Sequence, residues 1–499
     1  MSKLFEQLQP ILEKENAYSM AMALFSWDNA TQAPKGAINN TANAMGILSM
    51  ESYNLMINDH VKELLNQLST PAEQEQLTFN EKAIVKECKK SLDDLEKIPP
   101  EEYQAFVTLI TQANPIWEKA KNTNDYSYFK DTLDQVLMYS KKFANYCKKE
   151  GQSEYDYHLN ENEEGFTTSM CDEFFQKLKE SLIPLMRQVH AKKDQIRVDF
   201  MSRSFDIEKQ HELCDMLADH IGFDRNYGIT GETEHPFTLS LHNKDVRFTN
   251  HFHENAFVSA IFSAIHEGGH ALYEMGVSDD ISLSPVGGGA TTAMHESQSR
   301  LYENNLARSK EFWIPLWDKV VALFPDQLSD VTLDEFILAI NKSEPSLIRT
   351  EADELTYAFH VMVRYELERM LFNGDVTVDT LPQKWNDLYE EYLGVRPEND
   401  TTGVLQDMHW TSGFGYFPSY AIGSAISAQI MHSMKKILPV DELLTKGDLA
   451  PIREYLKEHV HQYGRTKTSE EMLLEMTGEK FNPQYFIDYL TEKYTRLYL

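Results

Sequence analysis

The sequence predicts a mainly α-helical protein that contains one small β hairpin. Of its 499 residues 42% are apolar, enough for a large core, whereas 22 glycines and 18 prolines are too few for an all-β chain with many turns. One stretch departs from this pattern. Residues 237–241 alternate apolar and polar side chains, a turn is expected at Asn243-Lys244, and a second short run covers 246–249. We therefore expect a hairpin over 237–249 within an otherwise helical fold.

The chain shows no boundary that would divide it into independent domains. Its length would allow about three domains, but it has no Ser-, Gly- or Pro-rich linker, no low-complexity block and no periodic repeat. Pro99-Pro100 and the acidic stretch 161–165 indicate turns between helices. We expect residues 1–499 to form a single folded unit.

Residues 266–270 read His-Glu-Gly-Gly-His, which is the HExxH pattern of zinc-binding helices. His266 and His270 would lie one turn apart on the same face of a helix, so both imidazoles can reach one metal ion. Glu267 lies off that line, where its carboxylate can address a water on the metal. Apolar residues at 257, 258, 261, 262 and 265 follow helical spacing, and Gly276 is expected to end the helix. Taken alone, the motif leaves open a histidine pair that only packs in a helical core.

Two glycines interrupt the expected helix. Gly268 and Gly269 should each cost about 1 kcal/mol relative to alanine. We interpret them as positions where another segment passes close to the helix backbone. A loop follows at 282–289, and a second helical run begins after Thr291 or Thr292, either of which can cap it.

Glu296, on this second run, is the expected third metal ligand. Catalytic zinc takes three protein ligands and leaves a position for water. Glu296 follows His270 by 26 residues, far enough for the chain to turn and bring a carboxylate back on a neighbouring helix. The nearby alternatives are weaker, because His295 would point about 100° away from Glu296 and Glu303 lies two turns further along.

Charge and cysteine content exclude several classes of function. The net charge is −31, from 78 acidic and 47 basic residues, and no basic cluster offsets it. Such a surface repels nucleic acid and anionic lipid, so we expect neither as a partner. The amino terminus lacks the apolar run of a signal peptide, and no stretch approaches 18 apolar residues. The four cysteines have no short paired spacing, which favours reduced thiols in a cytoplasmic protein.

Six motifs follow one another along the chain. They are 235–237 (His-Pro-Phe), 245–249 (Asp-Val-Arg-Phe-Thr), the HEGGH segment, 295–298 (His-Glu-Ser-Gln), 348–353 (Ile-Arg-Thr-Glu-Ala-Asp) and 403–410 (Gly-Val-Leu-Gln-Asp-Met-His-Trp). In these motifs and in their order the chain resembles the carboxypeptidase Taq group of zinc-type metallocarboxypeptidases. Weaker similarities at 27–28, 155–156, 477–479 and 485–486 extend the resemblance over essentially the whole chain.

The resemblance implies a large helical zinc-peptidase fold, with a deep substrate groove between two closely packed helical halves and the hairpin beside the metal helix. It implies that single amino acids are released from the carboxyl terminus of peptides, and that the catalytic unit 1–499 assembles as a homodimer.

Arg300 departs from one pattern of helical zinc peptidases. In some of them the third-ligand glutamate is followed four residues later by an acid that orients a zinc-binding histidine. Position 300 here is arginine. A carboxylate with that task must therefore come from elsewhere, and the sequence does not identify it.

The expected chemistry follows from these residues. One Zn²⁺ per chain, or Co²⁺ on the same ligands, would be held by His266, His270 and Glu296 and would lower the pKa of its bound water to about 7. Glu267 is the expected general base, which takes the proton of the attacking water and returns it to the leaving amine.

Substrate recognition is expected from the later motifs. Similarity to helical zinc peptidases implies that a phenol near the last motif donates to the oxyanion, Tyr420 ahead of Tyr416, although two tyrosines that pack a turn remain an alternative. The resemblance assigns the motifs at 348–353 and 403–410 to recognition of the terminal carboxylate. Arg349 is the expected guanidinium for it, with Gln406 and His409 as supporting donors and Tyr416 as a further substrate contact.

Neighbouring polar residues have structural interpretations. Arg247 competes with Arg349 for the terminal carboxylate, but at the end of the hairpin it is expected instead to pair with a nearby acid, and His235 is expected to serve the same structural purpose. For Asp353 an i+4 helical partnership with Arg349 is weighed at least equally with a catalytic part.

Two other functions remain open at this point. One is a helical zinc oligopeptidase that cuts internal bonds of short peptides. The other is a catalytically silent peptide-binding scaffold, against which the intact Glu267 argues. Cleavage of a peptide with and without a carboxyl-terminal amide separates the first from an exopeptidase.

Overall fold

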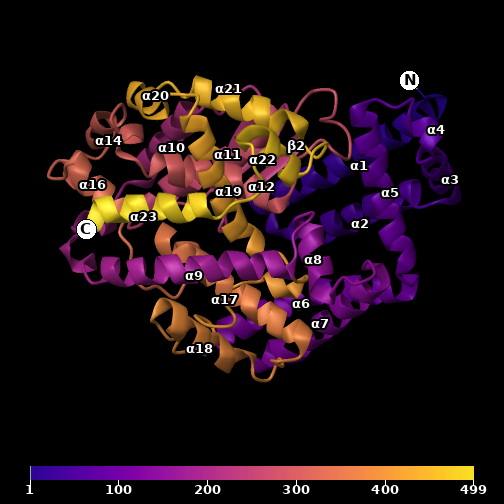
Figure 1. The fold of residues 1–499 in the computed structure, drawn as a ribbon, viewed down its shortest axis with the longest axis horizontal. Coiled ribbons are helices and arrows are strands. Elements are labelled where there is room, and N and C mark those ends of the chain that lie inside the picture. Colours follow the sequence, from indigo (N-terminus) through magenta and orange to yellow (C-terminus); the bar gives the residue numbers. More distant parts are fainter. Residues whose placement is uncertain (1) are drawn as a thin grey trace. The chain divides into compact units, whose positions relative to one another are not determined.

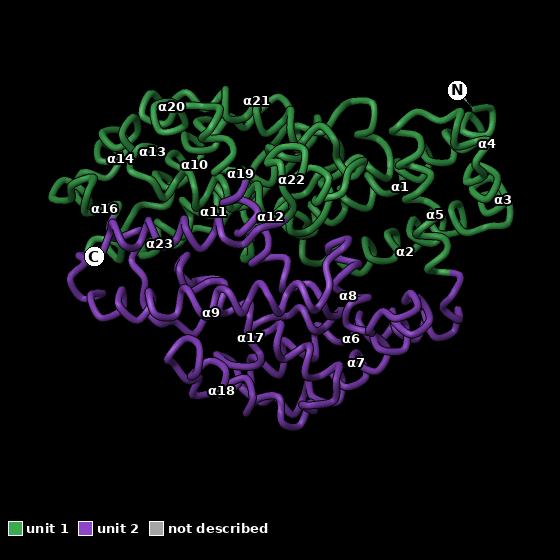
Figure 2. Tube along the Cα trace, viewed as in Figure 1, with its two compact units in different colours: residues 1–95, 198–337, 430–480 green, residues 96–197, 338–429, 481–499 purple. Residues whose placement is uncertain are grey.

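The computed structural model describes residues 2–499 and is mainly α-helical, with one three-stranded sheet (Figure 1). The expected fold class is confirmed. The chain forms two compact units, each assembled from three separate segments (Figure 2). Unit 1 comprises residues 1–95, 198–337 and 430–480, and unit 2 comprises residues 96–197, 338–429 and 481–499.

Unit 1 contains the sheet and the HEGGH helix. Its helices are α1 (Lys3–Thr31), α2 (Ile38–Met56), α3 (Asp59–Leu68), α4 (Pro71–Gln74), α5 (Phe79–Lys97), α10 (Ile207–Ile221), α11 (Phe257–Gly276), α12 (Thr292–Arg300), α13 (Lys310–Trp313), α14 (Trp317–Leu323), α15 (Pro325–Leu328), α20 (Val440–Lys446), α21 (Ala450–His459) and α22 (Ser469–Thr477). Two further helices, α16 (Leu333–Ile340) and α19 (Pro418–Lys435), contain residues of both units, and the last two residues of α5, Glu96 and Lys97, belong to unit 2.

The sheet has the strand order β1-β3-β2. The predicted hairpin is confirmed as the antiparallel pair of β2 (Thr238–His242) and β3 (Asp245–Asn250). Strand β1 (Gly228–Glu232), which runs parallel to β3, was not predicted. Its sequence, Gly-Ile-Thr-Gly-Glu, has two glycines and no apolar alternation, so local patterning gives no strand signal.

Helix α11 packs against β2, β3, α10 and α12. It ends at Gly276, as the sequence predicts. The interpretation of its internal glycines is confirmed. A Cβ on Gly268 would lie 2.4 Å from Cδ1 of Ile221 on α10, and a Cβ on Gly269 would lie 2.7 Å from Cα of Ser299 on α12. Glycine at 269 therefore lets the backbone of α12 approach the metal-motif helix.

Helix α12 is fixed at its start and extended at its end. The side chain of Thr291 accepts a hydrogen bond from the backbone N–H of Met294, so Thr291 is the cap. The π-helix Leu301–Ala307 follows directly. Wider turns of this kind are rare and occur mostly as short insertions near functional sites.

The amino-terminal helices of unit 1 pack on the segment that follows α11. Buried apolar residues of α1, α3 and α5 form one cluster with Val277, Ile281 and Val286. This cluster anchors the loop between α11 and α12.

Unit 2 is built around α17 (Glu354–Asn373), which is buried on nearly every side. It contacts α8, α9 and α18, and the long helix α9 also contacts α23 (Figure 1). The helices of this unit, besides α17, are α6 (Pro100–Thr123), α7 (Ser127–Cys147), α8 (Glu154–Asn162), α9 (Thr168–His190), α18 (Leu381–Leu393) and α23 (Gln484–Tyr498).

The four cysteines, Cys88, Cys147, Cys171 and Cys214, are buried and form no disulfide. Burial raises the pKa of the Cys88 and Cys214 thiols to about 12, so neither is a thiolate nucleophile at neutral pH. Within residues 2–499, no helix combines the length and the apolar character needed to cross a membrane.

Gly269→Ala tests the approach of α12 to α11. The new Cβ would force Ser299 and the carbonyl of Gln298 away, so we expect the free energy of unfolding to fall by about 1–3 kcal/mol. Denaturant unfolding measures this. Gly46→Ala in α2 is the matched control, because its Cβ meets nothing within 4 Å; it should stabilise by up to about 1 kcal/mol. Equal effects of both variants would contradict the close approach.

Candidate functional site

His266, His270 and Glu296 come together in unit 1. Oε2 of Glu296 lies 3.6 Å from Nε2 of His266 and 3.5 Å from Nε2 of His270. One ligand atom of each residue lies within 4.8 Å of the others. Ligands about 2.0–2.1 Å from a tetrahedral zinc ion stand about 3.4 Å apart. The three atoms therefore have the spacing of ligands around a single cation.

The Glu303 carboxylate fixes the imidazole of His266. Nδ1 of His266 donates to Oε2 of Glu303 over 2.8 Å, so the ring keeps its lone pair on Nε2, the atom that faces Glu296. Glu303 reaches this position from the π-helix Leu301–Ala307. It supplies the orienting carboxylate that the sequence left unidentified.

A chain of two hydrogen bonds fixes His270. Its Nδ1 lies 2.6 Å from Nδ1 of His295, and Nε2 of His295 lies 2.7 Å from Oε1 of Glu274. An ionised carboxylate can only accept, so His295 carries its proton on Nε2 and accepts from Nδ1–H of His270. Nε2 of His270 therefore keeps its lone pair toward Glu296. Sequence reasoning weighed His295 only as a ligand and missed this orienting contact.

Arg300 bridges two glutamates. Its Nε donates to Oε1 of Glu296 over 2.6 Å, and its Nη1 donates to Oε2 of Glu303 over 2.9 Å. Burial alone would raise the pKa of both carboxyls, but Arg300 and the neighbouring imidazoles, joined by Arg308 at Glu303, together hold both pKa values well below their usual range. Glu296 and Glu303 are therefore ionised at neutral pH.

The buried charges of this centre do not balance. Its carboxylates are Glu267, Glu274, Glu296 and Glu303, and its guanidinium groups are Arg300 and Arg308. With both imidazoles neutral, as metal ligation requires, two negative charges remain in excess, and unbalanced buried charge is costly. A divalent cation would neutralise them, and two imidazoles with one carboxylate are a known zinc donor set. The residues of this centre therefore fit a divalent cation.

Glu267 lies buried beside these ligands and is held from strand β2. Oγ1 of Thr238 donates to Oε2 of Glu267 over 2.6 Å. Burial raises the pKa of Glu267, which suits a group that accepts a proton and later returns it. Thr238 carries no sequence signal for this task beyond its place in the hairpin.

Arg349 lies in a second buried cluster, in unit 2. Its Nε and Nη2 donate to Oδ1 of Asp407 over 3.1 and 2.7 Å, and its Nη1 donates to the Tyr357 hydroxyl over 3.2 Å. Nε of Arg364 donates to Oδ2 of the same carboxylate over 2.7 Å. Asp407 therefore joins two buried arginines.

The expected helical pair of Arg349 and Asp353 is wrong. Arg349 lies in the 3-10 helix Arg349–Glu351, and Asp353 is the N-cap of α17, where it accepts from the backbone N–H groups of Leu355 and Thr356. By contrast, Arg247 pairs with a nearby acid as expected, through two 2.8 Å hydrogen bonds to Asp245.

Gln406 braces both arginines. Its Oε1 accepts from the backbone N–H of Arg349 over 3.3 Å and from Nη2 of Arg364 over 3.0 Å. Its Nε2 donates to the carbonyl oxygens of Leu347 and Thr402. Both amide hydrogens are therefore used within the protein.

The arginine cluster has an excess of positive charge. Arg349 and Arg364 are 6% and 0% exposed and share one carboxylate, Asp407, whose pKa they hold well below its usual range against the effect of burial. Burial lowers the pKa of His409 to about 4, so this ring adds no charge at neutral pH. Among contacts within residues 2–499, Arg349 uses three of its five N–H groups. Its two Nη atoms each keep one hydrogen for a two-point contact with an anion.

His409 and two tyrosines form an aromatic group beside Arg349. Nε2 of His409 lies 3.1 Å from the Tyr420 hydroxyl, and the rings of Tyr416 and Tyr420 are 5.2 Å apart. The Arg349 guanidinium lies 4.8 Å from the centre of the Tyr420 ring. Nδ1 of His409 is buried and has no hydrogen-bond partner within the described chain, 2–499. A neutral imidazole has one N–H, so His409 and Tyr420 cannot both present a free donor while they bond to each other.

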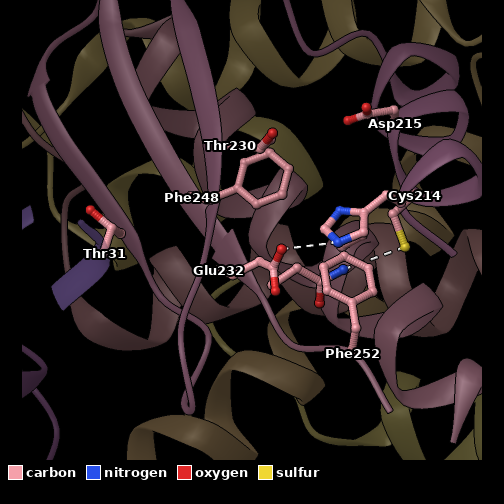
Figure 3. A pocket seen from close by; sticks show the side chains of 11 residues that line it. Thr31, Cys214, Asp215, Thr230, Glu232, Phe248 and Phe252 are labelled. Carbon is pink, nitrogen blue, oxygen red and sulfur yellow. Dashed lines mark hydrogen bonds and ion pairs between the residues drawn. The ribbon is translucent and has the colours of Figure 1, made fainter. Parts of the chain in front are cut away.

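A separate pocket of about 220 Å³ opens in unit 1 among residues of α10, β1 and β3 (Figure 3). Two pairs of the polar side chains that line it contact each other. Nε2 of His211 lies 2.9 Å from Oε1 of Glu232, and Nδ2 of Asn250 donates to Sγ of Cys214 over 3.4 Å. None of the three candidate metal ligands lines it, so we assign no catalytic role to this pocket.

Comparison with known proteins identifies the family. The family model for carboxypeptidase Taq (M32) metallopeptidases matches residues 7–494. The chain belongs to this family. It is therefore a metallocarboxypeptidase, a hydrolase that releases amino acids from the carboxyl terminus of peptides.

Relatives of this carboxypeptidase match over nearly their whole length. Carboxypeptidase 1 of Bacillus subtilis is 41% identical over 491 residues, 98% of this chain and 97% of that protein. Thermostable carboxypeptidase 1 of Pyrococcus furiosus is 32% identical over 98% of both chains. The crystal structure of the M32 carboxypeptidase from Deinococcus radiodurans superposes with a TM-score of 0.96 at 33% identity and covers 100% of both chains.

Sequence reasoning missed the roles of several residues of the two centres, among them Arg364, which it did not consider. Thr238 and Asp407 lie inside or beside motifs that had been noted, but neither motif says which partner the side chain meets. Glu274 lies one helical turn after His270 in the carboxypeptidase, on the same face of α11, and this spacing could have identified it. Glu303 had been considered as a ligand and set aside.

Glu303→Gln tests the orienting contact. Glutamine cannot accept from His266 as strongly as a carboxylate, and it removes one of the excess negative charges, so we expect affinity for the divalent cation to fall about 10- to 100-fold. Dialysis against metal buffers with elemental analysis measures it. Glu458→Gln, an exposed position on α21, is the control that should leave affinity unchanged. Equal affinity of E303Q and the control would refute the contact.

Proposed function

We propose that the cation of this metallocarboxypeptidase is zinc, one per chain, held by His266, His270 and Glu296. The donor set and the excess of two negative charges support this, although cobalt(II) suits the same ligands. When bound, the cation supplies Lewis acidity, which lowers the pKa of a coordinated water to about 7 and polarises the scissile carbonyl.

Glu267 is the general base of the proposed reaction. Thr238 donates to Oε2, so Oε1 is the oxygen that we assign to proton transfer. The carboxylate accepts the proton of the attacking water and gives it to the leaving amine. The pKa of Glu267, raised by burial, brings the carboxyl closer to the range in which both transfers are easy.

The terminal carboxylate of the substrate binds to the two Nη atoms of Arg349. The observation that carries this assignment is the excess positive charge of the buried Arg349–Asp407–Arg364 cluster, which one carboxylate would neutralise. A guanidinium binds a carboxylate through two parallel hydrogen bonds. Gln406 then acts by holding Arg349 and Arg364, since its own amide hydrogens are used within the protein.

Tyr420 is the proposed donor to the oxyanion that develops on the scissile carbonyl. In this role Nε2 of His409 donates to the Tyr420 oxygen and the Tyr420 hydroxyl donates to the oxyanion. Nδ1 of His409 is buried without a hydrogen bond in the described chain, although it lies 3.9 Å from Oδ1 of Asp407, and it then accepts from a substrate N–H. Tyr416, beside both rings, is a further substrate contact.

The oligomeric state and the cellular location of the enzyme are also proposals. Family membership supports a homodimer, and unbridged buried cysteines support a cytoplasmic location. The two alternative functions explain less of the structure. An oligopeptidase cuts internal bonds, so it would not need a buried excess of positive charge that binds a terminal carboxylate. A silent scaffold would have no use for Glu267.

Arg349→Gln tests carboxylate recognition. The wild type should prefer a peptide with a free carboxyl terminus to the same peptide with a terminal amide, and R349Q should lose about 10- to 100-fold in kcat/KM on the free peptide only. Product analysis by mass spectrometry measures both.

Arg369→Gln is the matched control, because Arg369 lies on α17 of the same unit and pairs with Asp172 at the surface. It should keep the preference for the free peptide. If the wild type cleaved the amidated peptide equally well, the oligopeptidase alternative would replace this proposal.

A further inference from the structure

Glu368, on α17, is a carboxylate buried without a cationic partner in residues 2–499. It is 1% exposed, and its hydrogen-bond partners are neutral groups. Burial raises the pKa of this carboxyl to about 7, even though the hydrogen bonds that it accepts act in the opposite direction. An unpaired buried carboxylate is costly, and a neutral side chain of similar volume would fill the space at a lower cost.

Three donors converge on this one carboxylate. The Tyr155 hydroxyl and the backbone N–H of Gly415 donate to Oε2 over 2.7 and 2.9 Å, and Nε1 of Trp410 donates to Oε1 over 2.8 Å. They come from α8, from the 3-10 helix His409–Thr411 and from the turn before α19. The two N–H donors cannot accept the hydrogen of a protonated carboxyl, and the Tyr155 hydroxyl could accept it only by giving up its own donation, so all three hydrogen bonds are made together only by the ionised form.

The carboxylate holds both ends of the segment 410–415. Trp410 is bound at one end and Gly415 at the other. Gly415 has a φ of +83°, and a Cβ there would lie 2.7 Å from the carbonyl oxygen of His158 on α8. Glycine is therefore needed for the backbone that aims this N–H at Glu368. His409 directly precedes the held segment, and Tyr416 directly follows it.

We propose that Glu368 is a positioning residue for substrate binding, which clamps the segment 410–415 and thereby sets the places of His409 and Tyr416. This inference rests on the proposed function, in which His409 and Tyr416 contact the substrate. Glu368 itself touches no reacting atom. The negative charge of Glu368 fixes the positions of these segments, because an ionised carboxylate can accept hydrogen bonds from donors on three separate segments at once.

Glu368→Gln breaks the clamp with little change in volume. With its amide oxygen toward Tyr155 and Gly415, the amide nitrogen of the new side chain would face Nε1 of Trp410, donor against donor. We expect faster amide hydrogen exchange across 408–417 in the substrate-free enzyme. For a peptide with a free carboxyl terminus we expect KM to rise about tenfold while kcat changes less than about threefold.

The pH dependence of KM also tests the inference, because a purely structural role of Glu368 would not change it. In the wild type the clamp should weaken as Glu368 takes up a proton, so KM should rise as the pH falls through about 7. In E368Q, which has no such proton to take up, KM should be high throughout and should lack this rise. Glu366→Gln is the matched control: Glu366 lies two residues away on α17, is bound by Lys179 and Tyr392, and should retain the wild-type exchange, KM and pH profile.

Trp410→Phe is the second variant, in case E368Q folds poorly. It removes one donor and keeps an aromatic ring, so it should raise exchange and KM in the same direction, and the double variant should not exceed E368Q alone. Unchanged exchange in both single variants, or faster exchange with unchanged KM, would overturn the inference. Exchange is read without substrate, so these outcomes differ from failure of the proposed function, which would appear as equal cleavage of free and amidated peptides by the wild type.

Discussion

The contact between the backbones of α11 and α12 at Gly269 is the constraint on which the metal centre depends. A side chain at this position would meet Cα of Ser299 at 2.7 Å. Only with this approach does Glu296, on α12, reach within 3.5 and 3.6 Å of the two histidines on α11. The π-helix that continues α12 then brings Glu303 to the other side of His266. One glycine thus permits both a candidate ligand and its orienting carboxylate.

The two centres have opposite excess charge, and this opposition fits the chemistry of carboxypeptidases. Unit 1 buries more glutamates than arginines around its two histidines, which suits a divalent cation. Unit 2 buries two arginines around Asp407, which suits a carboxylate. Hydrolysis at a carboxyl terminus needs a cation for the scissile carbonyl and an anchor for a carboxylate one residue away. Each unbalanced charge is costly in the free protein and would be compensated when its ligand binds.

Local patterning made much of this protein predictable. Periodicity and short motifs predict the helix over 257–276, the hairpin and the two histidine ligands, whereas Glu296 was predicted from the need for a third ligand on the next helical run. The pairing of Arg349 with Asp407, 58 positions away, cannot be predicted from such local patterns. Proximity in sequence wrongly suggested Asp353 as the partner of Arg349. Strand β1 is formed by pairing with β3 rather than by its own residues. Glu303 depends on a π-helix, which sequence periodicity of 3.6 cannot anticipate.

The most direct measurement is anomalous X-ray diffraction from crystals of the purified protein, recorded on both sides of the zinc absorption edge. One peak per chain, about 2.0–2.2 Å from Nε2 of His266, Nε2 of His270 and a carboxylate oxygen of Glu296, is the expected result. No peak there in zinc-replete protein, or a peak that excludes Glu296, would contradict the account.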